Sequence, residues 1–452
     1  MEYYDYTQPF VSRRSPVMGM RGVVATSHPL AAQAGMRMLL AGGNAVDAAI
    51  ATAAALVVLE PTSCGLGGDA FAIVWDSGRM HGLNASGRAP EGLSADAFRR
   101  AGMTKVPTEG WAPVTTPGVV SAWSALSRRF GCLPFREVIA PAVEYAREGA
   151  PVPPVIASYW NAAQKRFGGR GGVFKEFERA FLPGGRAPLP GEVYRNPDLA
   201  ATLQSIADSH GESLYRGNLA RAIAAHSEAT GGFLTLRDLA EHLPEWVQPV
   251  KAGYRGFDVW EIPPNGQGIV ALMALNIMEG FDLRDAPRLA PESLHVIIEA
   301  LRLAFADAHA YVGDPQAVEV PVDELLSPEY AAARRAQISL SGAMASVAPG
   351  RLDGRKTWEP SDGDTVYLST ADWEGMMVSY IQSNYMGFGS GVVVPDTGIS
   401  MQNRGAGFSL EEGHANELAP GRRPFHTIIP GFITQSGVPL AAFGVMGGDM
   451  QP

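Results

Sequence analysis

Helical and strand-like patterns occupy different parts of this 452-residue chain, and their separation is the strongest constraint on its fold. Helical spacing of apolar residues dominates most of the chain before residue 316, whereas strand-like runs follow one another after residue 365. Alternating βαβ units would instead place a helix after each strand. The separation therefore predicts an α+β protein in which helices and sheets form distinct layers.

The first half of the chain gives specific expectations. Residues 27–61 are rich in alanine, leucine and methionine on both sides of Gly42 and Gly43, which predicts two helices joined by a glycine turn. Residues 71–85 predict a β-hairpin. Because residues 168–196 hold most of the glycine and proline in the middle of the chain, they are predicted to form a surface loop.

The last third of the chain changes character twice. Residues 291–315 predict a long amphipathic helix that ends at Gly313. Residues 339–364 are polar and punctuated by glycine and proline, which is typical of an exposed linker. From Thr365 onward, short apolar runs predict successive strands, one of them within residues 390–394.

Composition narrows the class of protein. With 46% hydrophobic and 18% charged residues, the chain has ample material for a core. Its formal net charge of -10 argues against a nucleic-acid binder, since no basic stripe offsets it. The longest apolar run, within residues 45–61, contains Asp47 and Glu60 and predicts a buried helix rather than a membrane span. No apolar stretch typical of a secretory signal precedes the first arginines, so we expect a cytoplasmic protein.

The side chains that commonly hold metals or cofactors form no recognisable motif. Cys64 and Cys132 are the only cysteines, which excludes a disulfide framework and a C-x-x-C metal site. The nine histidines show no H-E-x-x-H spacing, and the glycine-rich stretches match neither a P-loop nor G-x-G-x-x-G. The serine within residues 387–391 stands one place late for a G-x-S-x-G elbow. We therefore expect no metal and no cofactor, and the usual local signature of a Ser-His-Asp hydrolase is missing.

Thr365 stands where the expected linker meets the first of the C-terminal strands. A threonine hydroxyl is a poor nucleophile unless a base lies beside it, and a free α-amine on the same residue is one such base. The pKa of an α-amine, about 7.7–8.0, suits it to accept protons near neutral pH. This amine exists only if the bond between Asp364 and Thr365 is cut, which the hydroxyl itself can begin by attacking the Asp364 carbonyl. From the residues alone, a threonine that merely starts a strand is the simpler alternative.

Segments along nearly the whole chain resemble, in the same order, those of the γ-glutamyltranspeptidase family of N-terminal-nucleophile hydrolases. The matching segments are residues 41–71, 115–123, 263–283, 306–315 and 363–391. The resemblance implies a four-layer αββα sandwich that is made as one precursor. It also implies cleavage between Asp364 and Thr365 into a large fragment, 1–364, and a small fragment, 365–452, which together form one structural domain. Thr365 would then be the nucleophile.

The resemblance assigns further catalytic roles. Ser383 falls where the family has a second threonine that hydrogen-bonds the nucleophile. Gly447 and Gly448 match the glycine pair whose backbone N–H groups form the oxyanion hole, where one donor contributes about 2.7–4 kcal/mol in comparable sites. Family members continue with further helices and strands after this glycine pair, so the small fragment is expected to be C-terminally incomplete.

The substrate pocket implied by the resemblance departs from the transpeptidase pattern. Arg88 stands two places later than the family's carboxylate-binding arginine, and Tyr385 replaces an asparagine. Arg404 lies in the segment where transpeptidases carry the acid that faces the substrate ammonium, and His426 and Thr427 replace paired serines. Losing that acid and gaining an arginine favours anionic groups over a zwitterion. This favours the oxamate amidohydrolase branch, although Arg88 and Arg404 could equally bond loop carbonyls.

The leading hypothesis is a self-processing amidohydrolase that cleaves a small amide, carrying a carboxylate or another polar group, through an acyl-enzyme. One alternative is a γ-glutamyl hydrolase or transpeptidase acting on glutathione-like substrates. The other is an unprocessed, non-catalytic member that serves as a binding protein. The expected partners are a small-molecule substrate and the protein's own two fragments as a heterodimer, without nucleic acid or membrane. Whether two such heterodimers associate is left open.

Overall fold

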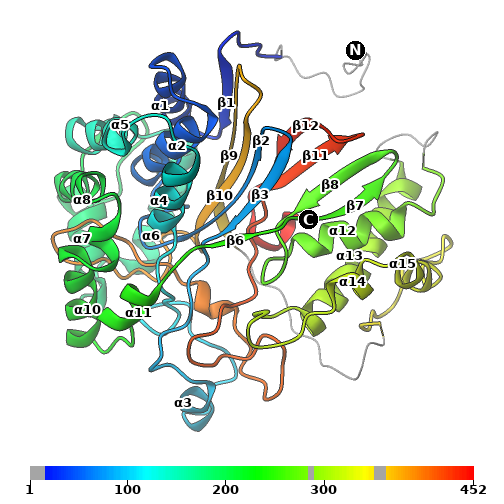
Figure 1. Ribbon diagram of the computed structural model, residues 1–452. Helices are drawn as coiled ribbons and strands as arrows, with labels where there is room; N and C mark the ends of the chain where they lie inside the picture. Colours follow the sequence, from blue (N-terminus) through cyan, green and yellow to red (C-terminus); the bar gives the residue numbers. More distant parts are fainter. Residues whose placement is uncertain (1–15, 284–289, 351–362) are drawn as a thin grey trace.

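Two antiparallel sheets lie face to face in the middle of the computed structural model, which describes residues 16–283, 290–350 and 363–452 (Figure 1). The first sheet has the order β1-β9-β10-β2-β3-β6 and the second the order β12-β11-β8-β7. The strands of the first sheet are β1 (Gly22–Thr26), β2 (Asp69–Asp76), β3 (Arg79–Asn84), β6 (Glu245–Val247), β9 (Asp364–Asp372) and β10 (Met377–Tyr385). Those of the second are β7 (Val250–Tyr254), β8 (Phe257–Glu261), β11 (Gly431–Gln435) and β12 (Val438–Phe443), and a separate pair consists of β4 (Ala150–Pro151) and β5 (Val193–Tyr194).

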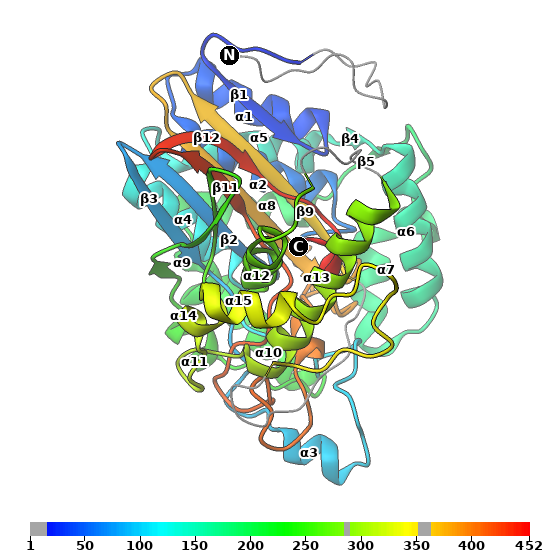
Figure 2. The ribbon, with the colours of Figure 1, turned by 90° about the vertical axis from the view of Figure 1, so that its right-hand side faces the viewer.

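Helices cover the outer face of each sheet, which gives the layer order helix, sheet, sheet, helix (Figures 1 and 2). On the first sheet lie α1 (Pro29–Leu40), α2 (Ala45–Leu59) and α4 (Val119–Phe130), while α5 (Phe135–Glu148) packs on α2 and α8 (Pro197–Asp208) on α5. On the second lies α12 (Gly268–Met278), against which α13 (Pro291–Tyr311) and α15 (Pro328–Arg335) pack, and α14 (Val322–Leu325) packs on α15. The other helices are α3 (Ala95–Arg100), α6 (Pro154–Phe167), α7 (Lys175–Phe181), α9 (Glu212–Tyr215), α10 (Asn218–Ala229) and α11 (Leu236–Glu241).

The alternation of side chains along β2 explains the layering. Ala70, Ala72 and Val74 belong to the core beneath the helices, whereas Phe71 and Ile73 pack between the two sheets. Because successive strand residues point to opposite faces, a strand that is apolar at every position must be covered on both sides. The middle of the first sheet is therefore buried on both faces.

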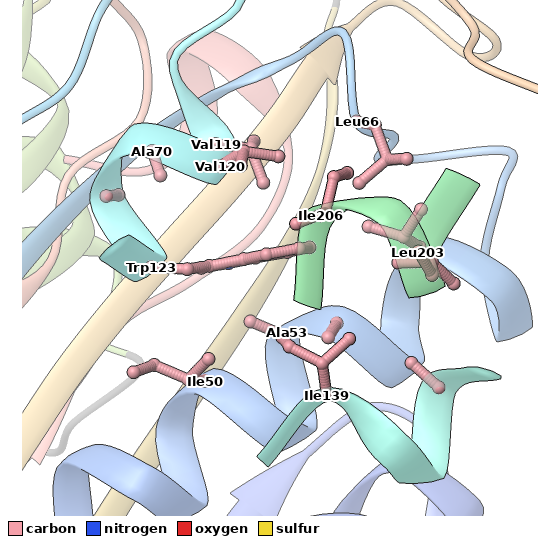
Figure 3. Close-up of a cluster of buried hydrophobic side chains, with 14 of the residues drawn as sticks. Ile50, Ala53, Leu66, Ala70, Val119, Val120, Trp123, Ile139, Leu203 and Ile206 are labelled. Atoms are coloured by element: carbon pink, nitrogen blue, oxygen red, sulfur yellow. The ribbon is translucent and has the colours of Figure 1, made fainter. Parts of the chain in front are cut away.

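The core under the helices is built around α2, in which every residue is buried (Figure 3). Its alanines let neighbouring elements approach closely, and Ile50 and Ala53 face the same cluster as Trp123 of α4 and Ile206 of α8. The indole of Trp123 donates to the hydroxyl of Tyr380 at 2.9 Å, which ties the helical layer to β10.

Several expectations are confirmed. The glycine turn at residues 42–43 separates α1 from α2, and α2 begins with a capping box between Asn44 and Asp47. The hairpin formed by β2 and β3 and the long helix α13 lie where they were predicted. The four-layer αββα arrangement agrees with the expected α+β fold.

Two local predictions are wrong. Residues 168–196 were expected to be surface loop, yet they contain α7, and Phe174, Phe177 and Phe181 are buried in an aromatic cluster. Residues 390–394 were expected to be a strand but form a buried loop with a single bridge between Val393 and Ser400. Gly391 adopts a φ of 75°, which strand backbone does not allow. An apolar run was mistaken for a strand because burial alone does not distinguish the two.

Part of the expected linker, residues 351–362, lies outside the described residues. Most of residues 339–350 are exposed, as predicted. Among the described residues, no helix combines the length and apolarity needed to span a membrane.

Candidate active site

Thr365 is the second residue of β9 and is buried at the end of the first sheet. Strand β9 pairs with β1 on one side and with β10 on the other. The pairing of β9 with β10 shifts register between Gln382 and Tyr385, so that Ser383 comes within reach of Thr365. The hydroxyl of Thr365 donates to Ser383 Oγ at 3.3 Å.

Ser383 contacts both the nucleophile and the bond that would be cut. Its hydroxyl donates to the carbonyl oxygen of Asp364 at 2.6 Å and accepts from the backbone N–H of Tyr385 at 2.7 Å. A hydrogen bond to a carbonyl oxygen strengthens as negative charge develops there during attack. In the uncut chain, the Asp364 carbonyl is therefore positioned for stabilisation of the oxyanion that the Thr365 hydroxyl would generate.

A cavity of about 950 Å³ opens beside Thr365. The polar residues of its lining, here called the polar wall, are Ser27, His28, Glu60, Ser63 and Asp364. The apolar part of the lining contains Pro153, Val155, Ile156, Tyr159, Met386, Met446 and Met450. The cavity is large enough for a small amide substrate together with its leaving group.

The acids of the polar wall are held in surroundings that disfavour their charge. Burial raises the pKa of Asp364, although the N–H of Thr365 and the hydroxyl of Ser63 partly oppose this shift. Burial also raises the pKa of Glu60, against the effect of the Ser27 hydroxyl, which donates to Glu60 Oε1 at 2.6 Å. The negative charge of Asp364 raises the pKa of Glu60 further. The two carboxyl groups therefore share one electrostatic environment.

Gly447 and Gly448 close the cavity on the side of the second sheet. Gly447 lines the cavity, and both residues adopt positive φ, at 132° and 56°. A side chain at Gly448 would come within 2.7 Å of the Gly363 nitrogen, so the residues before the scissile bond lie directly against this turn. The side-chain amide of Gln267 donates to the carbonyls of Thr427, at 2.6 Å, and of Gly448, at 2.9 Å.

Arg404 is fully buried behind this turn. Its guanidinium lies 4.0 Å from the ring centroid of Tyr385 and donates through Nη1 to Thr427 Oγ1 at 2.7 Å. Burial lowers the pKa of Arg404 to about 10, so the side chain is still cationic at neutral pH. Its Nε and Nη2 have no hydrogen-bond partner among the described residues. A buried guanidinium with unused donors is suited to receive an anion.

A second buried pair lies next to Arg404. Burial raises the pKa of Asp69 to about 7, although Gln402, Arg404 and the N–H of Gly87 act in the opposite direction. Burial, together with the nearby cations, keeps the pKa of His426 well below its ordinary value. The Nδ1 of His426 accepts from the N–H of Ile428 at 3.4 Å, so Nε2 carries the proton and donates to Asp69 at 3.1 Å. His426 is thus held neutral by its surroundings.

Arg88 is placed apart from this group. Its guanidinium pairs with Asp314 at 2.7 Å and with Glu245 at 3.3 Å, and it also donates to the carbonyl of Gly421. It lines a different, small cavity of about 50 Å³. The structure therefore brings Ser383, Tyr385, Gly447 and Gly448 together around residues 363–365. Arg404 lies against Tyr385, with Thr427 and His426 next to it, whereas Arg88 belongs to an ion-pair network elsewhere.

Sequence reasoning did not single out Asp69, Gln267, Glu60 or Ser63 as functional residues. Asp69 and Gln267 lie within the motifs that carried the family resemblance, and that position was the available signal. Glu60 and Ser63 lie within the same 41–71 segment, directly after a buried helix, so the same signal was available for them. In the part of the chain that the structure describes, no group of three or more histidine, cysteine or acidic side chains could hold a metal ion.

Comparisons with known proteins identify the family of the chain. Residues 31–452 match the family model for gamma-glutamyltranspeptidase. The chain is 36% identical over 439 residues to the glutathione hydrolase-like YwrD proenzyme of Bacillus subtilis, covering 96% of this chain and 80% of that protein. It is 37% identical over 438 residues to the oxamate amidohydrolase proenzyme of Klebsiella pneumoniae, covering 95% and 80%.

A solved structure agrees closely with the fold. The cephalosporin acylase from Bacillus halodurans superposes with a TM-score of 0.92 at 52% identity, covering 100% of this chain and 82% of that one. The family model, the relatives and the solved structure thus agree with one another and with the four-layer fold. The chain belongs to the γ-glutamyltranspeptidase family, has the fold of the N-terminal-nucleophile hydrolases, and is an amide-hydrolysing enzyme.

Proposed function

We propose that this protein cuts its own chain between Asp364 and Thr365 and then uses Thr365 to hydrolyse a small amide that bears a carboxylate. The observation that carries the proposal is the position of Ser383. Its hydroxyl bonds both the Thr365 hydroxyl and the Asp364 carbonyl, so nucleophile and target are held by one group.

Self-cleavage proceeds in two steps, a shift of the acyl group from nitrogen to oxygen and then hydrolysis of the resulting ester. The Thr365 oxygen loses its proton and bonds to the carbonyl carbon of Asp364. The C–N bond then breaks, the Thr365 nitrogen takes up a proton to become an α-amine, and an ester joins the two fragments. Water hydrolyses this ester, which leaves a new carboxyl group on Asp364 and restores the hydroxyl of Thr365.

Substrate hydrolysis then uses the new amine as the base. The α-amine takes the proton of the Thr365 hydroxyl as it attacks the substrate carbonyl. It returns that proton to the leaving amine, and an acyl ester forms on Thr365. Backbone N–H groups of Gly447 and Gly448 stabilise the oxyanion, and water releases the acid.

The carboxylate preference rests on Arg404. In the uncut chain, Gly363 lies against both Tyr385 and Gly448: a side chain added at Gly363 would meet the Tyr385 ring at 3.1 Å, and one added at Gly448 would meet the Gly363 nitrogen at 2.7 Å. Release of this segment after cleavage uncovers the space beside Tyr385 and Arg404. The unused donors of Arg404 then bind the carboxylate, next to the amide held at Thr365. The printed name of the Klebsiella relative, oxamate amidohydrolase, describes an amide of this kind.

A γ-glutamyl substrate is the second candidate, supported by the name glutathione hydrolase-like of the Bacillus relative. Such a donor also carries an ammonium group, which needs an acidic partner. Asp69 is the acid beside Arg404, but its carboxyl already accepts from Gly87, Gln402 and His426. The site therefore favours a carboxylate without a neighbouring ammonium.

Intact mass spectrometry of the purified protein tests the cleavage. We expect two fragments from the parent chain, the smaller beginning at Thr365, and a single uncut mass from Thr365→Ala. Ser383→Ala should cut at least tenfold more slowly. Ser379→Ala removes another fully buried hydroxyl of β10 as a matched control and should cut at the parental rate. An uncut parent without amidase activity would instead favour a binding protein.

Substrate choice is tested separately on the cut enzyme. Hydrolysis of oxamate is followed by ammonia release and hydrolysis of γ-glutamyl-p-nitroanilide by absorbance. Turnover of oxamate with little of the glutamyl compound supports the proposal. Turnover of the glutamyl compound alone would overturn the substrate preference and leave the self-cleavage proposal intact.

A further inference from the structure

Glu60 is a buried carboxyl in the wall of the Thr365 cavity that the proposed reaction leaves unused. It is the C-terminal capping residue of α2, where its N–H donates to Leu56 at 2.8 Å. Its carbonyl accepts from the N–H of Ser63 at 3.0 Å, and its carboxyl accepts from Ser27. Helix and turn therefore hold Glu60 in place independently of the residues around the scissile bond.

The position of Glu60 relative to Asp364 links it to the Thr365 nitrogen. In the uncut chain this nitrogen donates to Asp364 Oδ1 at 3.0 Å. Glu60, Asp364 and Thr365 line the same cavity, in which the two carboxyl groups interact electrostatically. Cleavage breaks the covalent bond that keeps Asp364 beside the nitrogen, whereas Glu60 stays on α2. The nitrogen also changes from a neutral amide to an amine that binds a proton.

We propose that Glu60 is the lasting electrostatic partner of the Thr365 α-amine, which it orients beside the hydroxyl and whose protonated form it stabilises. This inference rests on the proposed function, because the amine exists only after cleavage. Glu60 acts through the amine and is therefore a positioning residue. The consequence is a stronger base that becomes available only at higher pH, since a nearby negative charge favours the ammonium form.

Other titratable groups lie near Glu60 and could also change the pKa of the Thr365 α-amine. Asp364 lies on β9, Cys64 follows α2, His28 caps α1, and Tyr159 lies across the cavity on α6. Burial raises the pKa of Cys64 well above its ordinary value and lowers that of His28, so both are neutral near pH 7. Among these groups, Glu60 is the fixed one that can carry a negative charge after cleavage.

The experiment compares the cut parent enzyme with Glu60→Gln. The first readout is the pH dependence of kcat/KM for oxamate. The second is the pH dependence of acetylation of the Thr365 α-amine by acetic anhydride, followed by mass spectrometry of the small fragment. In Glu60→Gln, both midpoints should move about one pH unit lower, as expected for loss of one nearby opposite charge. Glu261→Gln, which alters a buried carboxyl on β8, should leave both midpoints unchanged.

Equal amine midpoints in the parent and Glu60→Gln would overturn the inference. If Glu60→Gln does not cut itself, Ser27→Ala replaces it, since this change keeps the carboxyl but removes its hydroxyl donor. Its midpoints should move in the same direction by less, and an absent shift would then count against the inference. Failure of the proposed function is distinguishable, because the parent chain would yield no fragment beginning at Thr365.

Discussion

Arg88 and Arg404 were both expected to bind substrate, and the structure gives them contrasting surroundings. Arg88 is partly exposed, and its guanidinium donates hydrogen bonds to Asp314, Glu245, Gln316 and the backbone carbonyl of Gly421. Arg404 is fully buried, stacks on Tyr385 and leaves Nε and Nη2 without partners among the described residues. The first arginine is saturated within the protein, whereas the second has donors available for a ligand.

The acids beside the two arginines have pKa values shifted in opposite directions. Burial raises the pKa of Asp69, next to Arg404, to about 7. Burial alone would also raise the pKa of Glu245, but Arg423 and Arg88 bring it below its ordinary value. The lowered pKa of Glu245 keeps this partner of Arg88 ionised, whereas a partly protonated Asp69 neutralises the charge of Arg404 less and leaves it for an anionic ligand.

The largest expected effect separates the two arginines by activity. Arg404→Met should lower kcat/KM for oxamate by about 10³-fold, because truncating one partner of a buried charged contact costs about 2–5 kcal/mol. Arg404→Lys should recover part of this loss, since it restores the charge without the planar fork. Measuring the cut fraction first ensures that only processed enzyme is compared. Equal turnover by Arg404→Met would remove Arg404 from the substrate site.

The next effect concerns stability and pH at Asp69. Because its folded pKa is raised above the unfolded value, the stabilisation linked to its proton is fully present below pH 4 and is lost as pH rises to about 7. The pKa rises from 3.8 to about 7, so the predicted loss is of the order of 4 kcal/mol at about 1.4 kcal/mol per pKa unit. It should be visible as a falling urea midpoint from pH 4 to 7 that Asp69→Asn lacks. Parallel curves for parent and variant would contradict it.

The smallest effect is expected at Arg88. Arg88→Ala leaves the buried carboxyl of Asp314 without its ion pair and should lower the free energy of unfolding by about 2 kcal/mol. The exposure of Arg88 limits this loss through solvent screening. Thermal unfolding measures it, and kcat/KM of the remaining cut enzyme should stay within twofold of the parent. A loss of turnover comparable to that of Arg404→Met would erase the distinction between the two residues.

Much of the fold followed from local pattern. The capped helices, the β2–β3 hairpin and the separation of helices from strands are set by residues close in sequence, such as Asn44 with Asp47. Local pattern failed at residues 390–394, where Gly391 breaks an apolar run, and at α7, whose phenylalanines are buried by contacts with Phe388. Those contacts join segments that are distant in sequence, so they produce no periodic pattern of apolar residues from which they could be predicted.

The candidate site also has residues that could be predicted from local sequence and residues that could not. Thr365 and Ser383 could be placed from the sequence because each stands at a recognisable point of a motif. The different surroundings of Arg88 and Arg404 could not be predicted from the sequence, because Asp314 and Glu245 come close to Arg88 only in the folded chain. The same is true of Glu60, which meets Asp364 across about three hundred residues of chain.

If the hydrogen bond between the Ser383 hydroxyl and the Asp364 carbonyl promotes cleavage, cleavage reports how many chains have folded. The pairing of β9 with β10 in the shifted register brings these two groups together. A chain that cuts itself by this route leaves a permanent chemical record that its sheets have assembled. The yield of fragments then measures the fraction of chains that ever folded, even after some of them have since been denatured.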